Sequence, residues 1–158
     1  NTGIAGSLRP ELDIGDLVVS RDAMYHDFDC CHFGYPVGKV PGLPESYPAD
    51  ETMIACACQA AEAVHPGHVI RGRVASGDQF ICSQEQKDRI IGVTGAMCTE
   101  MEGAGIAQAA YRNGLPFVIL RAISDKADHS AEMDYPTFEA LAAQRCAAVV
   151  MALAEKLC

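Results

Sequence analysis

The sequence contains no tryptophan, and aromatic residues make up only 6% of its 158 positions. It is also poor in positive charge, since 12 basic and 21 acidic side chains give a net charge of −9. Clustered Lys and Arg capture phosphate backbones and anionic lipids, so this balance argues against nucleic acid or a membrane as a partner. No uninterrupted apolar run reaches the roughly 18 residues that span a bilayer, and no secretory leader opens the chain. We therefore expect a cytoplasmic protein.

Cysteine is too scarce for a disulfide-stapled scaffold. Eight cysteines in 158 residues fall short of the roughly 8–10% that such secreted domains carry, so reduced thiols are expected. The segment 25–33 contains two histidines beside the adjacent pair Cys30 and Cys31. Zinc sites need cysteines spaced about two to four residues apart and a second ligand pair, and both are missing here. We expect no metal ion and no cofactor, and a cysteine–histidine metal module is the least favoured alternative.

Short apolar runs alternate with amphipathic helical patterns along the chain. Residues 21–48 show neither period and are interrupted by glycine and proline, which predicts a long ordered loop of functional importance. The alternation predicts a three-layer α/β/α fold with a central mixed sheet. The expected strands are 16–20, 69–75, 92–98 and 117–123, and the expected helices are 51–64, 84–91, 102–112 and 137–157.

Ligands of α/β sheets bind outside the carboxyl ends of the strands, where polar residues gather in this sequence. Glu100 and Glu102 flank Met101 at an expected strand-to-helix junction. Side chains at such a junction can diverge, so one carboxylate can face a pocket and the other the scaffold. The alternative is that both only stabilise a helix N-terminus. The segments expected to share this face are 1–7, 76–82, 99–102 and 124–128.

A charged residue interrupts the most apolar strand of the sequence. Arg121 needs a buried partner, which Glu100 or Glu102 can supply, and a purely structural ion pair is the alternative. Asp125 ends the same strand, where a partly desolvated carboxyl group with a raised pKa can act as a general acid. Helix N-capping is an equally open role for Ser124 or Asp125.

An aromatic residue follows the turn that ends the expected strand 69–75. Phe80 can stack on a planar base there, and the backbone of Ile81 can bind the edge of that base. Burial in the core is the alternative for Phe80, because most aromatic side chains are buried.

Together these segments resemble the 5′-methylthioadenosine/S-adenosylhomocysteine nucleosidase family, which has a nucleoside phosphorylase-like fold. The resemblance extends over essentially the whole chain, and its motifs are more specific in combination than singly. The matching segments are Asn1 to Gly6, Tyr25 to Asp27, Phe33 to Tyr35, Pro41-Gly42, Ser76 to Ile81, Glu100 to Glu102 and Arg121 to Asp125.

The resemblance implies hydrolysis of an N-glycosidic bond in methionine salvage, releasing adenine and a thioribose without a cofactor. Asp125 corresponds to the general acid at adenine N7, and Glu102 to the residue that binds the ribose hydroxyls. Phe80 corresponds to the residue that stacks on adenine, and Ile81 to the one whose backbone binds it. The other implied residues, which line or support the nucleoside pocket, are Met101, Ser124 and Arg121.

The resemblance also implies a homodimer, in which residues 30–41 of one subunit cap the site of its neighbour. Tyr135 corresponds to a residue that covers the 5′-substituent from within the same subunit. The residues of the capping segment that correspond to apolar contacts are Cys30, Phe33, Tyr35 and Pro41.

The family pattern differs from this sequence in two places. Ile4 occupies a position that is Ser in some relatives. The family also has about 70 residues before the Asn-Thr-Gly motif, and these carry the glutamate that activates the attacking water. Residues 1–158 are therefore expected to be one nucleosidase domain without its N-terminal strands and first helix, and without that glutamate.

Three other functions remain open at this point. A purine nucleoside phosphorylase needs a cationic phosphate cradle at the glycine-rich loop, near which only Arg9 lies. A futalosine or AMP nucleosidase would use the same fold with another substrate. A nucleoside-binding fragment without catalytic activity is the third alternative.

Overall fold

The computed structural model describes residues 1–157, and in its last helix the side chains of residues 131–136 and 157 lie outside that description. Tyr135, one of the predicted site residues, is among them. The strands are β1 (Thr2–Ser7), β2 (Leu17–Tyr25), β3 (Tyr47–Pro48), β4 (Val69–Ser76), β5 (Cys98–Glu100) and β6 (Leu120–Asp125). The helices are α1 (Glu51–Val64), α2 (Gln84–Thr94), α3 (Gly103–Arg112) and α4 (Ala131–Leu157), with one 3₁₀ turn at Cys31–Phe33.

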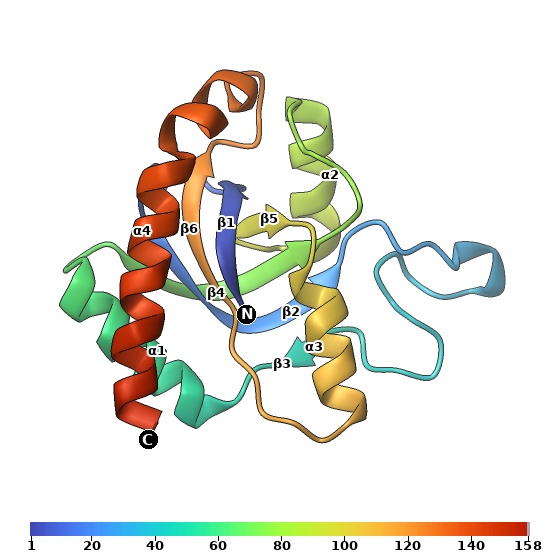
Figure 1. The fold of residues 1–158 in the computed structure, drawn as a ribbon. Helices are drawn as coiled ribbons and strands as arrows, with labels where there is room; N and C mark the ends of the chain where they lie inside the picture. The colour runs from blue at the N-terminus through green and yellow to red at the C-terminus, as the bar shows by residue number, and fades with distance from the viewer. Residues whose placement is uncertain (158) are drawn as a thin grey trace.

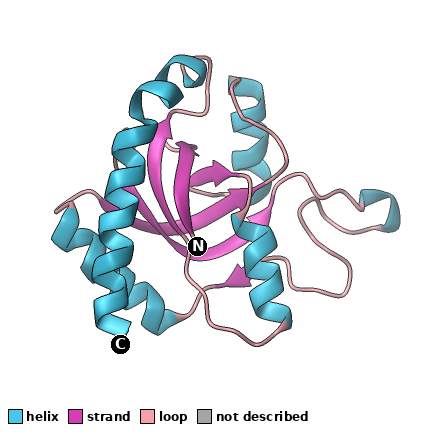
Figure 2. Cartoon of the chain, in the orientation of Figure 1, coloured by secondary structure: helices cyan, strands magenta, loops and turns pink. Residues whose placement is uncertain are grey.

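The strands form one mixed sheet in the order β3-β2-β4-β5-β1-β6, with helices packed on its outside (Figure 1). Helices α1 and α4 lie together on one side, whereas α2 and α3 lie on the other (Figure 2). The predicted mixed sheet covered by helices is confirmed. In addition, β6 pairs with the first residues of β2, so five strands close into a ring.

The closed sheet is built on apolar strands. Residues 17–19 of β2 are fully buried. Leu120 and Ile123 of β6 are buried as well, and so is Ile119, which directly precedes that strand. Such near-continuous apolar runs are typical of strands that are covered on both faces. The hydrophobic core therefore lies inside the ring and beneath α1 and α4.

Helix α1 has the bounds that its sequence predicts. Asp50 caps it by accepting a hydrogen bond of 2.9 Å from the backbone N–H of Met53. A cap of this kind contributes about 1 kcal/mol. Ile54, Ala57 and Ala61 are buried along one face of the helix, as the apolar pattern predicts.

Several boundaries differ from the sequence-based prediction, and β6 begins at Leu120 rather than at residue 117. Strand β2 extends to Tyr25, so the loop expected from residue 21 begins later. The strand expected at 92–98 is wrong, because α2 continues to Thr94 and β5 is confined to residues 98–100. Gly95 ends α2 in the left-handed conformation, with φ of 62°. The apolar β-branched residues of the last turns of α2 produced the strand-like pattern.

Helix α4 begins six residues before its predicted start at residue 137. Its described buried residues, Ala142, Cys146, Val149 and Leu153, recur at helical spacing and face β6, β1 and α1. The segment Thr137–Lys156 is nevertheless long and apolar enough to cross a membrane by length and composition. This property was not predicted from the sequence, because polar residues such as Gln144 and Arg145 interrupt the apolar run.

Candidate active site

A solvent-open cavity of about 140 Å³ lies where β1, β5, β6 and the loop after β4 meet. All four segments that were expected to share one face contribute to it. The lining residues are Ile4, Ala5, Gly6, Gln79, Phe80, Ile81, Thr99, Glu100, Met101, Glu102, Ser124 and Asp125.

Glu100 faces the scaffold. Its carboxylate is buried and accepts hydrogen bonds of 3.0 and 2.8 Å from the N–H of Gly103, at the start of α3. The Ser76 hydroxyl donates to the same carboxylate, and Arg121 forms an ion pair with it. A carboxylate at this position is also stabilised by the helix dipole. Glu100 therefore fixes the junction between β5 and α3.

Glu102 points the other way. Its side chain is 63% exposed, and its Oε2 lies 3.6 Å from Nη2 of Arg121. It makes no capping hydrogen bond to α3. The two carboxylates diverge at the junction, and Glu102 remains accessible at the cavity.

Arg121 joins both carboxylates to the first strand. It is buried, pairs with Glu100 and Glu102, and donates a hydrogen bond of 2.6 Å to Oδ1 of Asn1. A Cβ atom at Gly3 would lie 2.0 Å from Nη1 of Arg121, so the glycine of the Asn-Thr-Gly motif makes room for the guanidinium. The arginine in the apolar strand thus has the partners that the sequence predicted.

Asp125 is buried at the carboxyl end of β6. The Ser124 hydroxyl donates to its Oδ2 at 2.8 Å, and the N–H of Ala127 donates to its Oδ1 at 2.8 Å. Ala127 adopts a φ of 51°, unusual for a residue with a side chain, which turns its N–H back toward the carboxylate. Because α4 begins only at Ala131, N-capping by Ser124 or Asp125 is wrong.

Glycine in β1 allows close packing against Asp125. A Cβ atom at Gly6 would lie 2.7 Å from Oδ1 of Asp125 and 2.9 Å from the Cβ of Ala127. With glycine at position 6, β1 therefore approaches the Asp125 carboxylate more closely than it could with any other residue type at that position.

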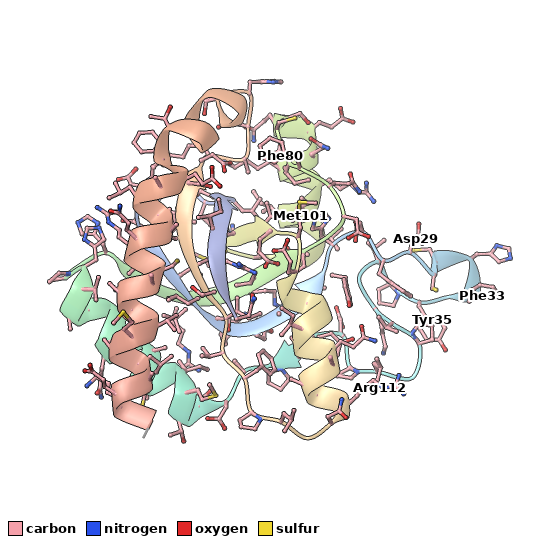
Figure 3. All side chains as sticks on the ribbon, in the orientation of Figure 1. Asp29, Phe33, Tyr35, Phe80, Met101 and Arg112 are labelled. Carbon is pink, nitrogen blue, oxygen red and sulfur yellow. The ribbon has the colours of Figure 1, made fainter. Side chains whose placement is uncertain are left out.

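Apolar side chains form part of the cavity wall (Figure 3). Phe80 and Met101 are each 46% exposed, whereas Ile81, which also lines the cavity, is buried. The alternative that Phe80 is buried in the hydrophobic core is therefore wrong. An accessible aromatic ring beside a buried carboxyl group suits a planar heterocycle that accepts a proton.

The predicted capping segment lies away from this cavity. Phe33 and Tyr35 are on the loop that projects beside β3, far from Phe80 and Met101 in Figure 3. Phe33 is 75% exposed, and Pro41 is exposed as well. Among the described residues that line the cavity, none belongs to 30–41. The capping role of Cys30, Phe33, Tyr35 and Pro41 stays a prediction.

The chain matches known proteins along almost its whole length. The family model described as the phosphorylase superfamily matches residues 1–155. A 5′-methylthioadenosine/S-adenosylhomocysteine nucleosidase of Geobacillus kaustophilus is 40% identical over 154 residues, which cover 97% of this chain and 66% of the relative. One from Exiguobacterium is 38% identical over 158 residues, covering 99% and 68%. The chain belongs to this nucleosidase family.

Solved nucleosidases have the same fold. The S-adenosylhomocysteine nucleosidase of Streptococcus pyogenes, in complex with 5-methylthiotubericidin, has a TM-score of 0.93 and 37% identity, over 100% of this chain and 67% of its own. The nucleosidase of Neisseria meningitidis with methylthio-immucillin-A has a TM-score of 0.95 and 37% identity, over 99% and 68%. Futalosine hydrolase of Helicobacter pylori has a TM-score of 0.93 and 35% identity, over 98% and 66%. The chain spans about two thirds of the length of these nucleosidases.

Two residues of the cavity and its support were not predicted from the sequence. Ser76 was seen only as part of a turn, but its hydroxyl binds Glu100 and accepts a 2.7 Å hydrogen bond from the N–H of Ala104. Thr99 lines the cavity and is 5% exposed, and its hydroxyl has no hydrogen-bond partner among the described residues. In both cases the sequence feature that could have indicated the residue is a hydroxyl side chain within an apolar strand.

Proposed function

We propose that this nucleosidase hydrolyses the N-glycosidic bond of 5′-methylthioadenosine and S-adenosylhomocysteine, releasing adenine and a 5-thioribose product. The observation that carries the proposal is the meeting of a buried carboxyl group, an accessible carboxylate and an exposed aromatic ring in one cavity. These are Asp125, Glu102 and Phe80, which come from three separate segments.

Adenine is a poor leaving group as an anion, so its departure requires a proton. In the proposed reaction Asp125, in its acid form, donates that proton to N7 while the bond from C1′ to N9 breaks. Ser124 and the N–H of Ala127 hold the carboxyl group in place. A positioned general acid contributes about 10²- to 10⁴-fold to the rate.

The sugar gains positive charge as the bond breaks. Glu102 is the accessible carboxylate beside the cavity, and it accepts hydrogen bonds from the ribose hydroxyls in this proposal. Hydrogen bonds to sugar hydroxyls strengthen in oxocarbenium-like transition states. Arg121, 3.6 Å from Glu102, fixes the orientation of that carboxylate.

Water attacks C1′, its oxygen forms the new bond, and one of its protons is removed. Glu100 does not fit the role of the base, since both its oxygens are already hydrogen bonded. The family resemblance assigns this step to a glutamate that precedes the Asn-Thr-Gly motif. The test therefore uses the full-length protein.

The experiment measures adenine release from 5′-methylthioadenosine in H₂¹⁸O, with and without phosphate. We expect equal rates in both buffers and one ¹⁸O atom at C1 of the thioribose product. A strict requirement for phosphate, with a sugar 1-phosphate as product, would identify a phosphorylase and overturn the proposal. Futalosine is the second substrate to assay, because the Helicobacter pylori futalosine hydrolase is 35% identical with a TM-score of 0.93.

We also propose that the protein is a cytoplasmic homodimer acting in methionine salvage, with residues 30–41 capping the neighbour's cavity. The support is the 75% exposure of Phe33 on a projecting segment. Phe33→Ser should raise KM for 5′-methylthioadenosine and weaken the dimer in light-scattering measurements. Leu115→Ser, at an exposed apolar position outside this segment, is the matched control. An unchanged KM together with an unchanged mass would contradict the capping role.

A further inference from the structure

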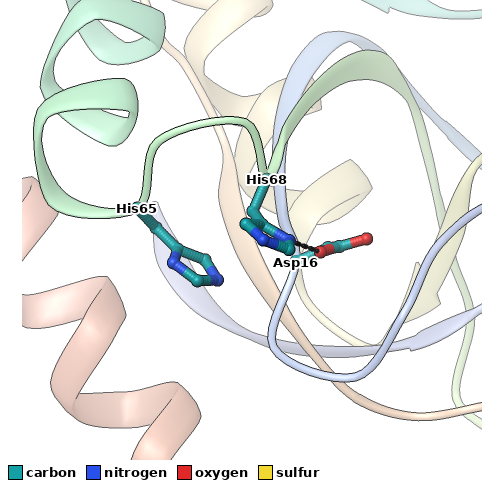
Figure 4. A group of neighbouring side chains, drawn as sticks. All are labelled: Asp16, His65 and His68. Atoms are coloured by element: carbon teal, nitrogen blue, oxygen red, sulfur yellow. Dashed lines mark hydrogen bonds and ion pairs between the residues drawn. The ribbon is translucent and has the colours of Figure 1, made fainter.

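Two histidines and an aspartate meet beyond the N-terminal ends of β2 and β4 (Figure 4). His65 follows α1, His68 directly precedes β4, and Asp16 directly precedes β2. The parallel register of the two strands pairs Leu17 with Val69, which brings Asp16 beside His68. Nδ1 of His68 lies 2.8 Å from Oδ1 of Asp16. One ligand-capable atom from each residue lies within 4.8 Å of the other two.

The carboxylate of this cluster is held in place by the backbone. Asp16 is buried, and its Oδ2 accepts a 2.8 Å hydrogen bond from the N–H of Asp13. Its carbonyl accepts another, also of 2.8 Å, from the N–H of Ile123. Oδ1 is therefore kept pointing at the histidines, as a preorganised metal ligand requires.

We propose that Asp16, His65 and His68 bind one divalent transition-metal ion, with Zn²⁺ as the representative ion. Two imidazole nitrogens and one carboxylate oxygen are usual zinc ligands and leave a fourth position for water. Imidazole also disfavours Mg²⁺ and Ca²⁺, which prefer oxygen ligands. Nothing in the sequence pointed to this group, because Asp16 is far from the histidines along the chain.

Binding requires one imidazole ring to turn. The rings of His65 and His68 are stacked, with centroids 4.2 Å apart and planes at 11°. A metal ion lies in the plane of each imidazole that binds it, so parallel rings cannot share one ion. His68 is exposed and His65 half-buried, so either ring can rotate without disturbing Asp16.

The charges around the cluster act in both directions. Burial, followed by the nearby Arg145 and His68, lowers the pKa of His65, which keeps its lone pair available near neutral pH. Arg145 opposes a bound cation, and its Nη1 donates a 2.7 Å hydrogen bond to the carbonyl of Gly15. The Asp16 carboxylate and the net charge of −9 favour a bound cation. Arg145→Gln should therefore tighten metal binding.

The site is separate from the candidate active site. His68 precedes the first residue of β4, whereas Ser76, which binds Glu100, is its last residue. Eight residues of strand at about 3.3 Å each place the two sites roughly 20 Å or more apart. A bound ion would fasten the loop after α1 to the turn before β2, and its expected effect is on stability.

The test titrates metal-free full-length protein with Zn²⁺ by calorimetry and with Co²⁺ by visible absorption. All variants are made in a background protein that carries Cys30→Ser and Cys31→Ser. These two adjacent thiols are partly or fully exposed and could bind Zn²⁺ themselves. We expect one ion per chain, a rise in Tm with Zn²⁺, and at least a tenfold loss of affinity in His65→Gln and in His68→Gln. His32→Gln, an exposed histidine elsewhere, should bind as the background does.

Two results would overturn the site. One is the absence of Zn²⁺ binding and of any Tm shift in the background protein. The other is undiminished binding in the variant that combines His65→Gln and His68→Gln. Both histidines are accessible at the surface, so these variants keep the fold, which circular dichroism checks.

Discussion

At the residue scale, Glu100 and Glu102 make opposite contributions although they are two positions apart. Glu100 is enclosed by Arg121, Ser76 and the first amide of α3, whereas the Glu102 side chain is 63% exposed. Removing one member of a buried pair leaves an uncompensated charge, which costs about 3–5 kcal/mol. An exposed side chain carries no such penalty. Substitution of Glu100 should therefore affect mainly stability, and substitution of Glu102 mainly activity.

Glu100→Gln should lower the free energy of unfolding by about 3 kcal/mol or more, because Arg121 loses its buried counter-charge. Glu102→Gln should leave that free energy nearly unchanged and lower kcat/KM for 5′-methylthioadenosine at least tenfold. Urea unfolding and initial rates on the full-length protein measure both effects. Equal destabilisation by the two substitutions would show that they do not divide their roles in this way.

Thr99→Val should stabilise the protein by about 0.5–1 kcal/mol, since valine replaces a buried hydroxyl that has no described partner. The comparison is Ser76→Ala, which removes a hydroxyl that is hydrogen bonded and should destabilise. Thermal unfolding of both variants checks the sign. A lower Tm for Thr99→Val would mean that its hydroxyl stabilises the fold.

Single residues of the site were predictable where their type was out of place in its segment. An arginine inside an apolar strand indicated Arg121, and a Ser-Asp pair at the end of that strand indicated Asp125. Ser76 and Thr99 were not predictable, because their importance depends on which strands become neighbours. That pairing joins positions distant in sequence.

At the element scale, β2 and β4 are the longest paired strands, and a partly buried ion pair links them. Their register places Asp22 opposite Arg73. The single Nε–H of Arg73 is shared between both carboxylate oxygens at 3.0 Å, and its Nη2 donates to Oδ2. Burial by itself raises the pKa of Asp22, but the hydrogen bonds and charge of Arg73 outweigh it, and the pKa lies below its usual value. The charged form of Asp22 therefore stabilises the folded state.

This lowered pKa predicts how stability changes in acid. Because Asp22 binds its proton more weakly when folded, its contribution is present above about pH 4 and is lost as the pH falls through the folded-state pKa. Asp22→Asn should lower stability at pH 7 and flatten its pH dependence below pH 4. Urea unfolding between pH 2 and pH 7 measures this, with Glu11→Gln at an exposed position as the control. An unchanged acid slope would exclude Asp22 as the titrating group.

Elements with strong end signals were predictable, as α1 shows with its Asp50 cap. The boundary between α2 and β5 was not, because Val93 and Thr94 are β-branched and fit a strand as well as the last turn of a helix. The structure ends the helix at Gly95, whose positive φ satisfies the last turn. Local sequence does not choose between these two conformations, whereas packing of α2 against β4 does.

At the scale of the whole molecule, the alternation of strands and helices was enough to predict a mixed sheet with helices around it. The closure of the sheet was not, since the antiparallel pairing of β6 with β2 joins residues about a hundred positions apart. The pairing of β1 with both β5 and β6 gathers the ends of these three strands around one cavity. The predicted site residues meet there because of the topology.

The central claim is that Asp125 is the acid which makes adenine leave. The most direct measurement is the kcat of full-length Asp125→Asn for adenine release from 5′-methylthioadenosine, beside Asp88→Asn on the exposed face of α2. Circular dichroism and Tm verify that both variants fold. The account predicts a loss of about 10²-fold or more for Asp125→Asn and a wild-type rate for Asp88→Asn. A folded Asp125→Asn protein with undiminished turnover would contradict it.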